Sequence, residues 1–248
     1  MTLDPATLAE ATRVLHDSPL FHGIDKQTLR EILAKLHLKC WPRHSHVMEP
    51  SDTIRHFYVL LEGRIKVTRR HPETGRELTL FLLGPGNGFN VISLLDGRAH
   101  DVDTIALDDV KALSAPVERW HQWLEQYPPL RRALREFVGY RIKQLSELAS
   151  ELALDDTMGR LVHLLLRHFN GDRHTGHPNL IRDLSQEELA HMIGSVRPVV
   201  ARLLGELKRE GIIDTTGGQL HVLDLQRLLE KAEKRMNDAN SQSRENPG

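Results

Sequence analysis

One stretch near the C-terminal end of the chain, Leu184 to Ile213, constrains the fold most, because it encodes two short helices joined by a tight turn. Ser185 can cap the first helix, and Glu188, three residues later, can reach back to the cap in the capping-box pattern. Gly194 ends that helix, since glycine adopts a positive φ most easily. Pro198 is tolerated only in the first turn of a helix and therefore marks the start of the second one.

The second helix has an apolar face and a basic one. Its apolar residues recur at helical spacing, and they are Val199, Val200, Leu203, Leu204 and Leu207. Arg197 and Arg202 project from the remaining surface. The two helices resemble a DNA-binding helix-turn-helix, whose second helix enters the major groove, although two helices around a glycine turn also occur as ordinary core packing. Thr216-Gly217-Gly218-Gln219 between two short apolar runs predicts a hairpin, and a helix-turn-helix followed by a hairpin is a winged helix.

Composition sets the outer limits of fold and location. The 248 residues leave room for two domains, and 40% apolar with 27% charged residues is typical of a soluble globular protein. No run approaches the about 18 consecutive apolar residues of a membrane span, and the N-terminus lacks a secretory pattern, so we expect a cytoplasmic protein without membrane contact. The net charge of -1 gives no general attraction to nucleic acid, so contact with phosphate must depend on local placement.

The first part of the chain predicts helices followed by short strands. The segment Pro5 to His16 is amphipathic, and Asp25 offers a cap for a second packing helix. From Leu38 to Ala115, runs with period-two alternation are separated by Gly, Pro, Asp and Asn, which predicts a small antiparallel barrel or sandwich. The expected turns are Glu62-Gly63-Arg64, Pro72-Glu73-Thr74-Gly75, Gly84-Pro85-Gly86-Asn87-Gly88 and Asp96-Gly97-Arg98.

A long helix is predicted after Pro128 and Pro129, which suit a first helical turn. Apolar residues then follow in steps of three or four, as in a coiled-coil seam. We expect this seam to form a dimer interface from Leu130, Leu134, Phe137, Arg141, Leu145 and Leu148. Arg141 interrupts the apolar seam and needs a partner if it is buried. The alternative is a helix that lies on its own N-terminal domain.

The order of N-terminal helices, short strands, long helix and winged helix-turn-helix resembles the Crp/Fnr family of bacterial transcription regulators from about residue 15 to residue 222. Three stretches carry the resemblance, namely Phe57 to Val67 (FYVLLEGRIKV), Gly84 to Asp96 and Leu184 to Ile213. It implies an α+β fold with an antiparallel β jelly-roll sensor domain, a homodimer through the long helix, and promoter binding controlled by a signal. The domains expected are an effector-sensing barrel with N-terminal helices at 1–117, a dimerisation helix region at 118–153, a winged helix-turn-helix at 154–223, and a C-terminal helix and tail at 224–248.

The sensor segment departs from the family pattern where a cyclic nucleotide is held. Members that bind one carry a Gly-Glu-Leu segment, whose Glu accepts from the ribose hydroxyl, and an Arg-Ser or Arg-Thr pair for the phosphate. Alignment on Gly86 and Gly97 puts Val91 in place of the Glu and His100-Asp101 in place of the pair. An aspartate repels a phosphate and a valine accepts no hydrogen bond, so we expect no cyclic AMP binding of the usual kind.

Other signals remain open. The single cysteine, Cys40, cannot supply the iron–sulfur cluster of the oxygen-sensing branch. The haem-containing, carbon monoxide-sensing branch resembles this chain around Phe89, but Asn90-Val91-Ile92 lies where its cysteine and histidine ligands are expected. Fifteen histidines keep haem, and with it a gas or redox signal, as a candidate. We take Asn90 and His100 as candidate effector contacts, and the sequence predicts no metal site.

The resemblance carries over to the DNA-reading helix position by position. Arg197 and Arg202 match the two base-reading arginines, and arginine suits guanine because it donates to both O6 and N7. Between them the family usually has a Glu that accepts from cytosine, where this chain has Pro198. That base is therefore read less strictly, or through apolar contact of Pro198 or Val199 with a thymine methyl. The candidate phosphate contacts are Ser195 and Gln186. The expected partners are duplex DNA with a palindromic operator and RNA polymerase.

An enzymatic function is not expected, because the chain lacks a Gly-x-Ser-x-Gly elbow, a phosphate loop and an HExxH helix. The alternative function is a ligand- or redox-responsive regulatory module that acts on a protein partner without binding DNA. After the wing, Asp224 to Met236 predicts another amphipathic helix, and Asn237 to Gly248 is polar and predicted to be disordered. The sequence gives this extension no role and does not separate activation from repression.

Overall fold

The structure is a computed structural model that describes residues 4–48, 55–169 and 180–232. The chain forms two compact units. The first is made mainly of Met1–Arg70 and Phe81–Lys143, and the second of His71–Leu80, Gln144–Asp172 and Pro178–Gly248. The division therefore falls inside a β-hairpin and inside the long helix.

Aspartates cap the two N-terminal helices. α1 (Pro5–Asp17) follows Asp4, whose Oδ1 accepts from the backbone N–H groups of Ala6 and Thr7 at 3.0 and 3.1 Å. α2 (Lys26–Leu33) follows Asp25, the cap expected from the sequence. The short 3-10 helix η1 (Pro19–Phe21) lies between them. Each cap satisfies N–H groups that have no partner within the helix.

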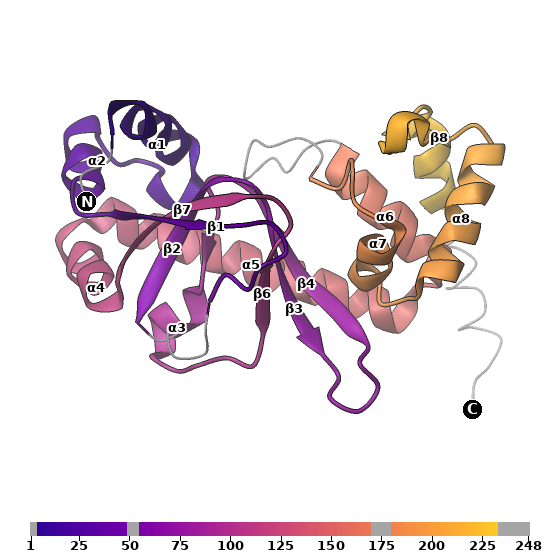
Figure 1. Cartoon of the computed structure of the whole chain (residues 1–248), viewed down its shortest axis with the longest axis horizontal. Helices are drawn as coiled ribbons and strands as arrows, with labels where there is room; N and C mark the ends of the chain where they lie inside the picture. Colours follow the sequence, from indigo (N-terminus) through magenta and orange to yellow (C-terminus); the bar gives the residue numbers. More distant parts are fainter. Residues whose placement is uncertain (1–3, 49–54, 170–179, 233–248) are drawn as a thin grey trace. The chain divides into compact units, whose positions relative to one another are not determined.

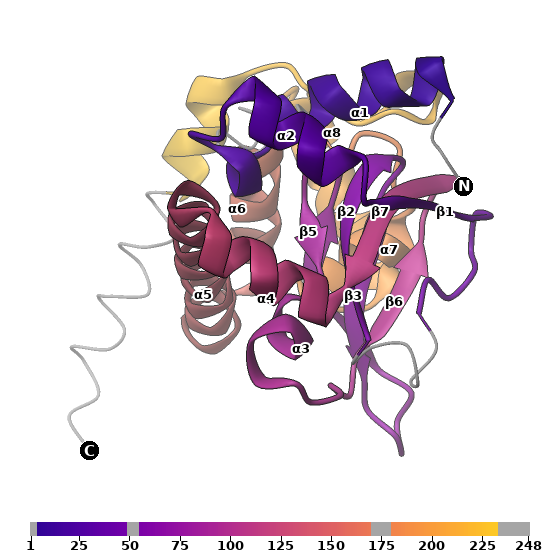
Figure 2. The ribbon, with the colours of Figure 1, turned by 90° about the vertical axis from the view of Figure 1, so that its left-hand side faces the viewer.

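Two β-sheets follow the N-terminal helices (Figures 1 and 2). One has the strand order β1-β7-β2-β5 and the other the order β4-β3-β6. The strands are β1 (His37–Trp41), β2 (His56–Glu62), β3 (Ile65–Arg70), β4 (Glu77–Leu83), β5 (Gly88–Phe89), β6 (Asp103–Ala106) and β7 (Val110–Pro116). β1 with β7, β2 with β5, β2 with β7, and β3 with β6 pair antiparallel. The antiparallel β domain predicted from period-two alternation is confirmed.

The central strand β2 is buried on both faces because its alternate residues enter two different cores. Phe57, Val59 and Leu61 pack with the helices of the first unit, while Tyr58 and Leu60 pack between the sheets. The later helices of this part are α3 (Val91–Asp96), α4 (Val117–Gln126) and α5 (Pro128–Leu154). Figure 2 shows α4 lying beside α5, and residues of both helices enter the same core as α1 and α2.

The turn between β2 and β3 requires glycine. Gly63 has a φ of +80°, and a Cβ at this position would lie 2.4 Å from the carbonyl oxygen of Asp109. We expect Gly63→Ala to lower the free energy of unfolding by about 3 kcal/mol, because a backbone clash adds to the strain of a positive φ. Gly75 is a matched control, since its φ is +67° and no atom lies within 4 Å of its added Cβ.

Gly75→Ala should therefore lower the free energy of unfolding by only about 1 kcal/mol. Denaturant titration of both variants measures the difference. Equal losses for the two variants would mean that the contact with Asp109 adds nothing to the cost.

The second unit contains a winged helix-turn-helix. Its elements are α6 (Thr157–Phe169), α7 (Gln186–Met192), α8 (Arg197–Arg209), β8 (Ile213–Asp214), η2 (Thr216–Gly218) and β9 (His221–Val222). β8 and β9 pair antiparallel as the predicted hairpin. Residues 225–232 form a further helix within the segment Asp224 to Met236 predicted as helical. The rest of that prediction, and the polar tail Asn237 to Gly248, lie outside the described residues.

Candidate DNA-binding site and sensor pocket

The turn between α7 and α8 follows the sequence signals closely. Ser185 caps α7, and its Oγ accepts from the backbone N–H of Glu188 at 3.1 Å. Gly194 has a φ of +61°, and a Cβ there would lie 2.7 Å from Cδ2 of Leu152. The N–H of Ser195 donates to the carbonyl of Ala190 at 2.8 Å, which closes the turn. The backbone angle therefore favours glycine at position 194, and any larger residue would also have to displace the end of the Leu152 side chain.

α8 presents its two arginines on the outside. Its buried face is formed by Val200, Leu203, Leu204 and Leu207. Arg197 is the first residue of the helix, Arg202 lies five residues later, and both are exposed. A rise of about 1.5 Å per residue separates them by about 7.5 Å along the axis, roughly two base steps of 3.4 Å. Within the described parts of the chain, neither guanidinium has a hydrogen bond or an ion pair.

The other predicted DNA contacts lie near these arginines or at the start of α7. Pro198 is exposed in the first turn of α8, and Val199 is half-buried beside it. Ser195 is half-buried in the turn. Gln186 is the exposed first residue of α7. The start of α7 and the start of α8 are the places from which a helix-turn-helix reaches DNA, so all six predicted residues stay candidates.

A contact that the sequence did not signal joins the β3–β4 hairpin to the helix-turn-helix within the second unit. Arg76 donates from Nη2 to the carbonyl of Gly194 at 3.4 Å. Glu77 lies 3.4 Å from Nδ1 of His191 on α7, and its side chain is only 5% exposed. Since β4 continues from Glu77 to Leu83, the hairpin is covalently continuous with the sheet of the sensor domain.

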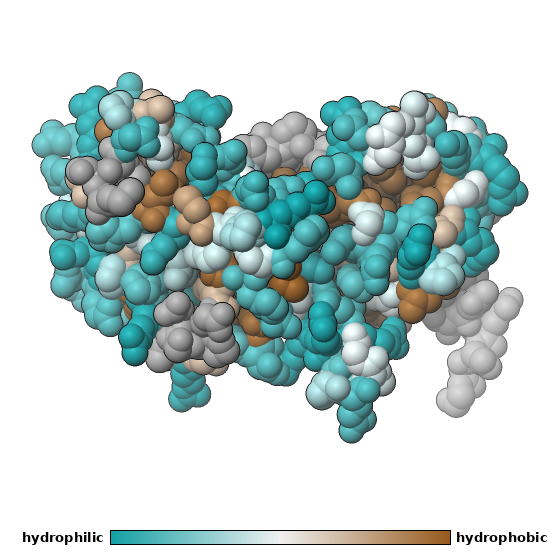
Figure 3. Space-filling model, in the orientation of Figure 1, coloured by the Kyte–Doolittle hydropathy of each residue, from teal (hydrophilic) through white to brown (hydrophobic). Residues whose placement is uncertain are grey.

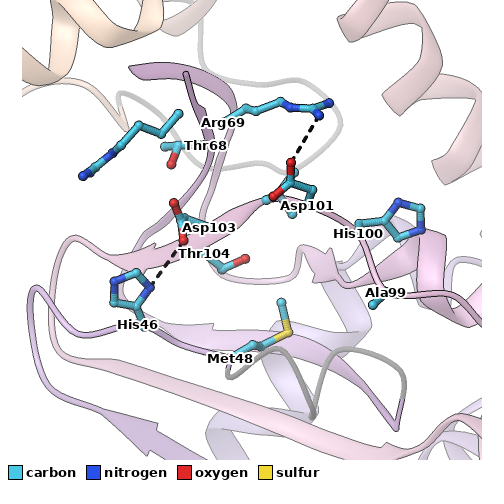
Figure 4. Close-up of a pocket in the computed structure, with 11 residues that line it drawn as sticks. His46, Met48, Thr68, Arg69, Ala99, His100, Asp101, Asp103 and Thr104 are labelled. Carbon is cyan, nitrogen blue, oxygen red and sulfur yellow. Dashed lines mark hydrogen bonds and ion pairs between the residues drawn. The ribbon is translucent and has the colours of Figure 1, made fainter. Parts of the chain in front are cut away.

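The sensor domain contains a cavity of about 670 Å³ (Figure 4). It is lined by His46, Met48, Thr68, Arg69, Arg70, Ala99, His100, Asp101, Val102, Asp103 and Thr104. His100, a predicted effector contact, is among these residues. Asn90, the other one, caps α3 with a φ of +68° and donates from Nδ2 to the carbonyl of His56 at 2.7 Å. Its side chain therefore holds the backbone together and is not a lining group of the cavity.

The cavity is polar and carries charges of both signs. Arg69 pairs with Asp101 at 3.2 Å and His46 lies 3.7 Å from Asp103, as the dashed lines in Figure 4 show. At the end of α3, the backbone N–H of Arg98 lowers the pKa of Asp96, and His100 contributes to a lesser degree. Thr68 is 0% exposed, and its hydroxyl has no hydrogen-bond partner in the described parts of the chain. A buried hydroxyl without a partner is costly.

The burial of residues on the long helix contradicts part of the predicted dimer seam. Leu130, Leu134 and Phe137 are at most 6% exposed and lie in the core of their own unit, so they are not available to a second copy. Arg141 is 6% exposed, donates to Oδ1 of Asn87, and lies 4.8 Å from the ring centre of Phe137. The first part of the predicted stripe, from Leu130 to Arg141, is therefore a face with which α5 packs on its own domain, which was the alternative interpretation of the same spacing.

Leu145 and Leu148, the last two residues of the predicted seam, are half-buried. The exposed side of α5 has a stripe of its own in steps of three and four. It consists of Gly139, Ile142, Ser146, Ala149 and Ala153. Ile142 is 62% exposed, so it leaves a large apolar side chain in contact with solvent in the single chain.

Comparison with known proteins assigns the chain to a family. Residues 38–127 match the cyclic nucleotide-binding domain, and residues 159–231 match the Crp-like helix-turn-helix domain. The global nitrogen regulator of Synechocystis is 33% identical over 193 residues, which cover 75% of this chain and 84% of that protein. The chain belongs to the Crp/Fnr family. It is a transcription regulator of that type with a helix-turn-helix DNA-binding domain, and the relatives it matches are regulators and not enzymes.

Other members of the Crp/Fnr family align over most of their length. The CRP-like cAMP-activated global transcriptional regulator of Mycobacterium tuberculosis is 24% identical over 221 residues, 88% of this chain and 98% of that protein. A solved CRP/FNR-family regulator of Thermus thermophilus is 27% identical, and the alignment has a TM-score of 0.60. It covers 80% of this chain and 100% of the Thermus chain. The c-di-GMP responsive regulator CLP of Xanthomonas campestris shares the fold at 22% identity, with a TM-score of 0.68 over 81% of this chain and 100% of its own.

Crp-like regulators bind DNA as dimers. In the described residues of this Crp/Fnr protein, no helix combines the length and apolar character needed to cross a membrane. Most of the face shown in Figure 3 is hydrophilic, with apolar residues in separate patches.

Proposed function

We propose that this Crp/Fnr protein is a homodimer that reads a palindromic promoter site with Arg197 and Arg202, under the control of a signal other than cyclic AMP. The observation that carries the proposal is that both guanidinium groups are exposed on a helix whose opposite face is buried. Arginines without an intramolecular partner keep their fork of donors available for O6 and N7 of guanine. RNA polymerase is the proposed partner at the promoter, on the strength of the family resemblance.

The remaining contacts follow from the positions of the side chains. Pro198 has no polar group, so the base between the two guanines is read weakly or through a thymine methyl that contacts Pro198 or Val199. Ser195 and Gln186 lie at the turn and at the start of α7, where side chains contact phosphates. These two contacts fix the register on the duplex and do not distinguish sequences.

We assign the dimer contact to the exposed stripe of α5 that contains Gly139, Ile142 and Ala149. Its steps of three and four match the a and d positions of a two-helix seam, and its small residues let two helices approach closely. A two-fold axis beside α5 would give each dimer two reading helices, as a palindromic site requires.

The signal is proposed to act at the sensor domain, where the polar cavity lined by His100 is available to a small polar ligand. Haem and a redox signal stay as candidates. An absorbance scan of purified protein for a Soret band separates haem from the other candidates.

Selection of duplexes from a random library, followed by gel shift, tests the DNA-binding part of the proposal. The expected result is a two-fold symmetric consensus with guanines in each half, bound more weakly as salt increases. Absence of any selected sequence, with and without added haem, would favour a module that acts on a protein partner instead.

Calorimetry with cyclic AMP tests the exclusion of that ligand. We expect no saturable heat at millimolar ligand, because Asp101 lines the cavity with a carboxylate and Val91 offers no acceptor for a ribose hydroxyl. A cyclic AMP-activated relative titrated in parallel is the positive control. Tight binding by the present chain would show that its pocket recognises the nucleotide through other residues.

A further inference from the structure

The C-terminal helix, residues 225–232, carries two cations that engage the end of the recognition helix α8. Glu206 on α8 and Glu210 at its C-cap are one turn apart, and like charges at this spacing repel each other. The ammonium of Lys231 lies 2.6 Å from both carboxylate oxygens of Glu210 and 3.5 Å from Oε1 of Glu206. The side chain of Lys231 is only 17% exposed, so its charge is held between these two acids.

A second cation binds the backbone at the same place. Arg227 donates from Nη1 to the carbonyl of Glu210 at 2.7 Å, and Glu210 is the C-cap residue of α8. The last carbonyls of a helix lack partners and carry the negative end of its dipole, so a cation there is favourable.

The C-terminal helix is itself anchored to the core of the second unit. Leu228 is 0% exposed and Ala232 is 6% exposed. The backbone N–H groups of Leu223 and Asp224 both donate to the carbonyl of Ile212, at 2.8 and 3.2 Å. The cations of this helix therefore project from a fixed support and not from a free tail.

We propose that helix 225–232 braces the recognition helix and that Lys231 is a positioning residue for base reading, an inference that rests on the proposed reading of DNA by Arg197 and Arg202. The turn at Gly194 fixes the N-terminal end of α8, and the brace fixes its C-terminal end. Base contacts require side chains held to within about 0.5 Å. Attraction to phosphates acts over the screening length of about 10 Å and tolerates a tilt of the helix.

Loss of these contacts should therefore reduce the affinity for the operator more than the affinity for DNA of random sequence. In full-length Lys231→Met, we expect binding to the selected operator to weaken about fivefold to tenfold, while binding to random duplex changes less than about twofold. The slope of affinity against salt should stay unchanged, because Lys231 is engaged with Glu206 and Glu210 and not with phosphate. Lys231→Arg keeps the cation and should restore selectivity.

Lys208→Met is the matched control. Lys208 is also at the end of α8, but its side chain is 53% exposed, and its partners are Asp214 at 3.4 Å and Thr215 at 3.1 Å, outside helix 225–232. Any effect of Lys208→Met should be equal on operator and random DNA. If Lys231→Met fails to fold, as judged by its thermal transition, Arg227→Gln removes the other tie and should show the same selective loss.

Three outcomes would contradict the proposed role of Lys231. The first is an unchanged operator affinity in Lys231→Met, and the second is an equal loss of affinity for operator and random DNA with a salt slope reduced by about one. The third is a loss of selectivity that Lys231→Arg does not restore. Failure of the wild-type protein to select any sequence is a separate result, which would count against the proposed function itself.

Discussion

Replacement of Arg197 by alanine is expected to weaken operator binding by about 2–6 kcal/mol per dimer, because one bidentate contact with guanine contributes about 1–3 kcal/mol and a symmetric dimer makes it twice. Arg202→Ala should cost a similar amount at a different base pair. The loss should be specific, so each variant should lose its preference for guanine at one position only. Competition gel shifts at fixed salt, with duplexes substituted one base pair at a time, measure this directly.

Arg209→Ala is the matched control for both variants. Arg209 is exposed at the C-terminal end of the same helix, away from the end that enters the groove. Its removal should act equally on all sequences and reduce the salt slope by at most about one per subunit. If Arg197→Ala gave the same uniform loss, Arg197 would be a phosphate contact and the assignment of base reading to it would be wrong.

The elements of the helix-turn-helix were predictable because each boundary depends on a local signal. Ser185 caps α7, Gly194 adopts a positive φ, and Arg197 and Pro198 begin α8. Each of these residues acts on its neighbours in the chain, so the sequence alone contains the relevant physics. The antiparallel sheets were predictable for the same reason, since alternation and glycine turns are properties of short segments.

The packing partner of α5 was not predictable in that way. A stripe of leucines at helical spacing shows that one face is covered, but the same spacing serves a dimer seam and a contact with the domain that precedes it. Leu130 and Phe137 face their own core, and only the structure could show this. The sequence did show that Arg141 would need a partner, but it could not identify Asn87, which lies 54 residues earlier.

Contacts between distant segments were missed for a related reason. Arg76 and Gly194 are 118 residues apart, and neither the hairpin nor the turn carries a pattern that points to the other. The contacts of Lys231 with the end of α8 likewise come from a segment whose role could not be inferred from the sequence. The exposure of Ile142 was also not predictable, because a single isoleucine between Arg141 and Lys143 forms no pattern in the sequence. Its exposure becomes informative only when the burial of its neighbours is known.

Ile142→Glu is the prediction that tests the corrected dimer seam. Ile142 is 62% exposed in the single chain, so glutamate should leave the fold of the protomer intact. In a two-fold seam the substitution places two carboxylates near each other and removes apolar contact from both helices. We expect a monomer by analytical ultracentrifugation at micromolar concentration, and operator affinity reduced by about 100-fold or more, because the two half-sites are no longer bound as one.

Leu154→Glu introduces the same change at an exposed leucine of the same helix. Leu154 is 73% exposed and, at about 100° per residue, lies roughly 120° around the helix from Ile142, off the stripe. This variant should stay dimeric and bind the operator as the wild type does. A duplex with one half-site adds a second check, since Ile142→Glu should bind it as well as the wild-type subunit does if only association is lost. If Ile142→Glu remained a dimer, the two-fold axis would lie at another surface. The spacing of the two reading helices would then differ from the one proposed here.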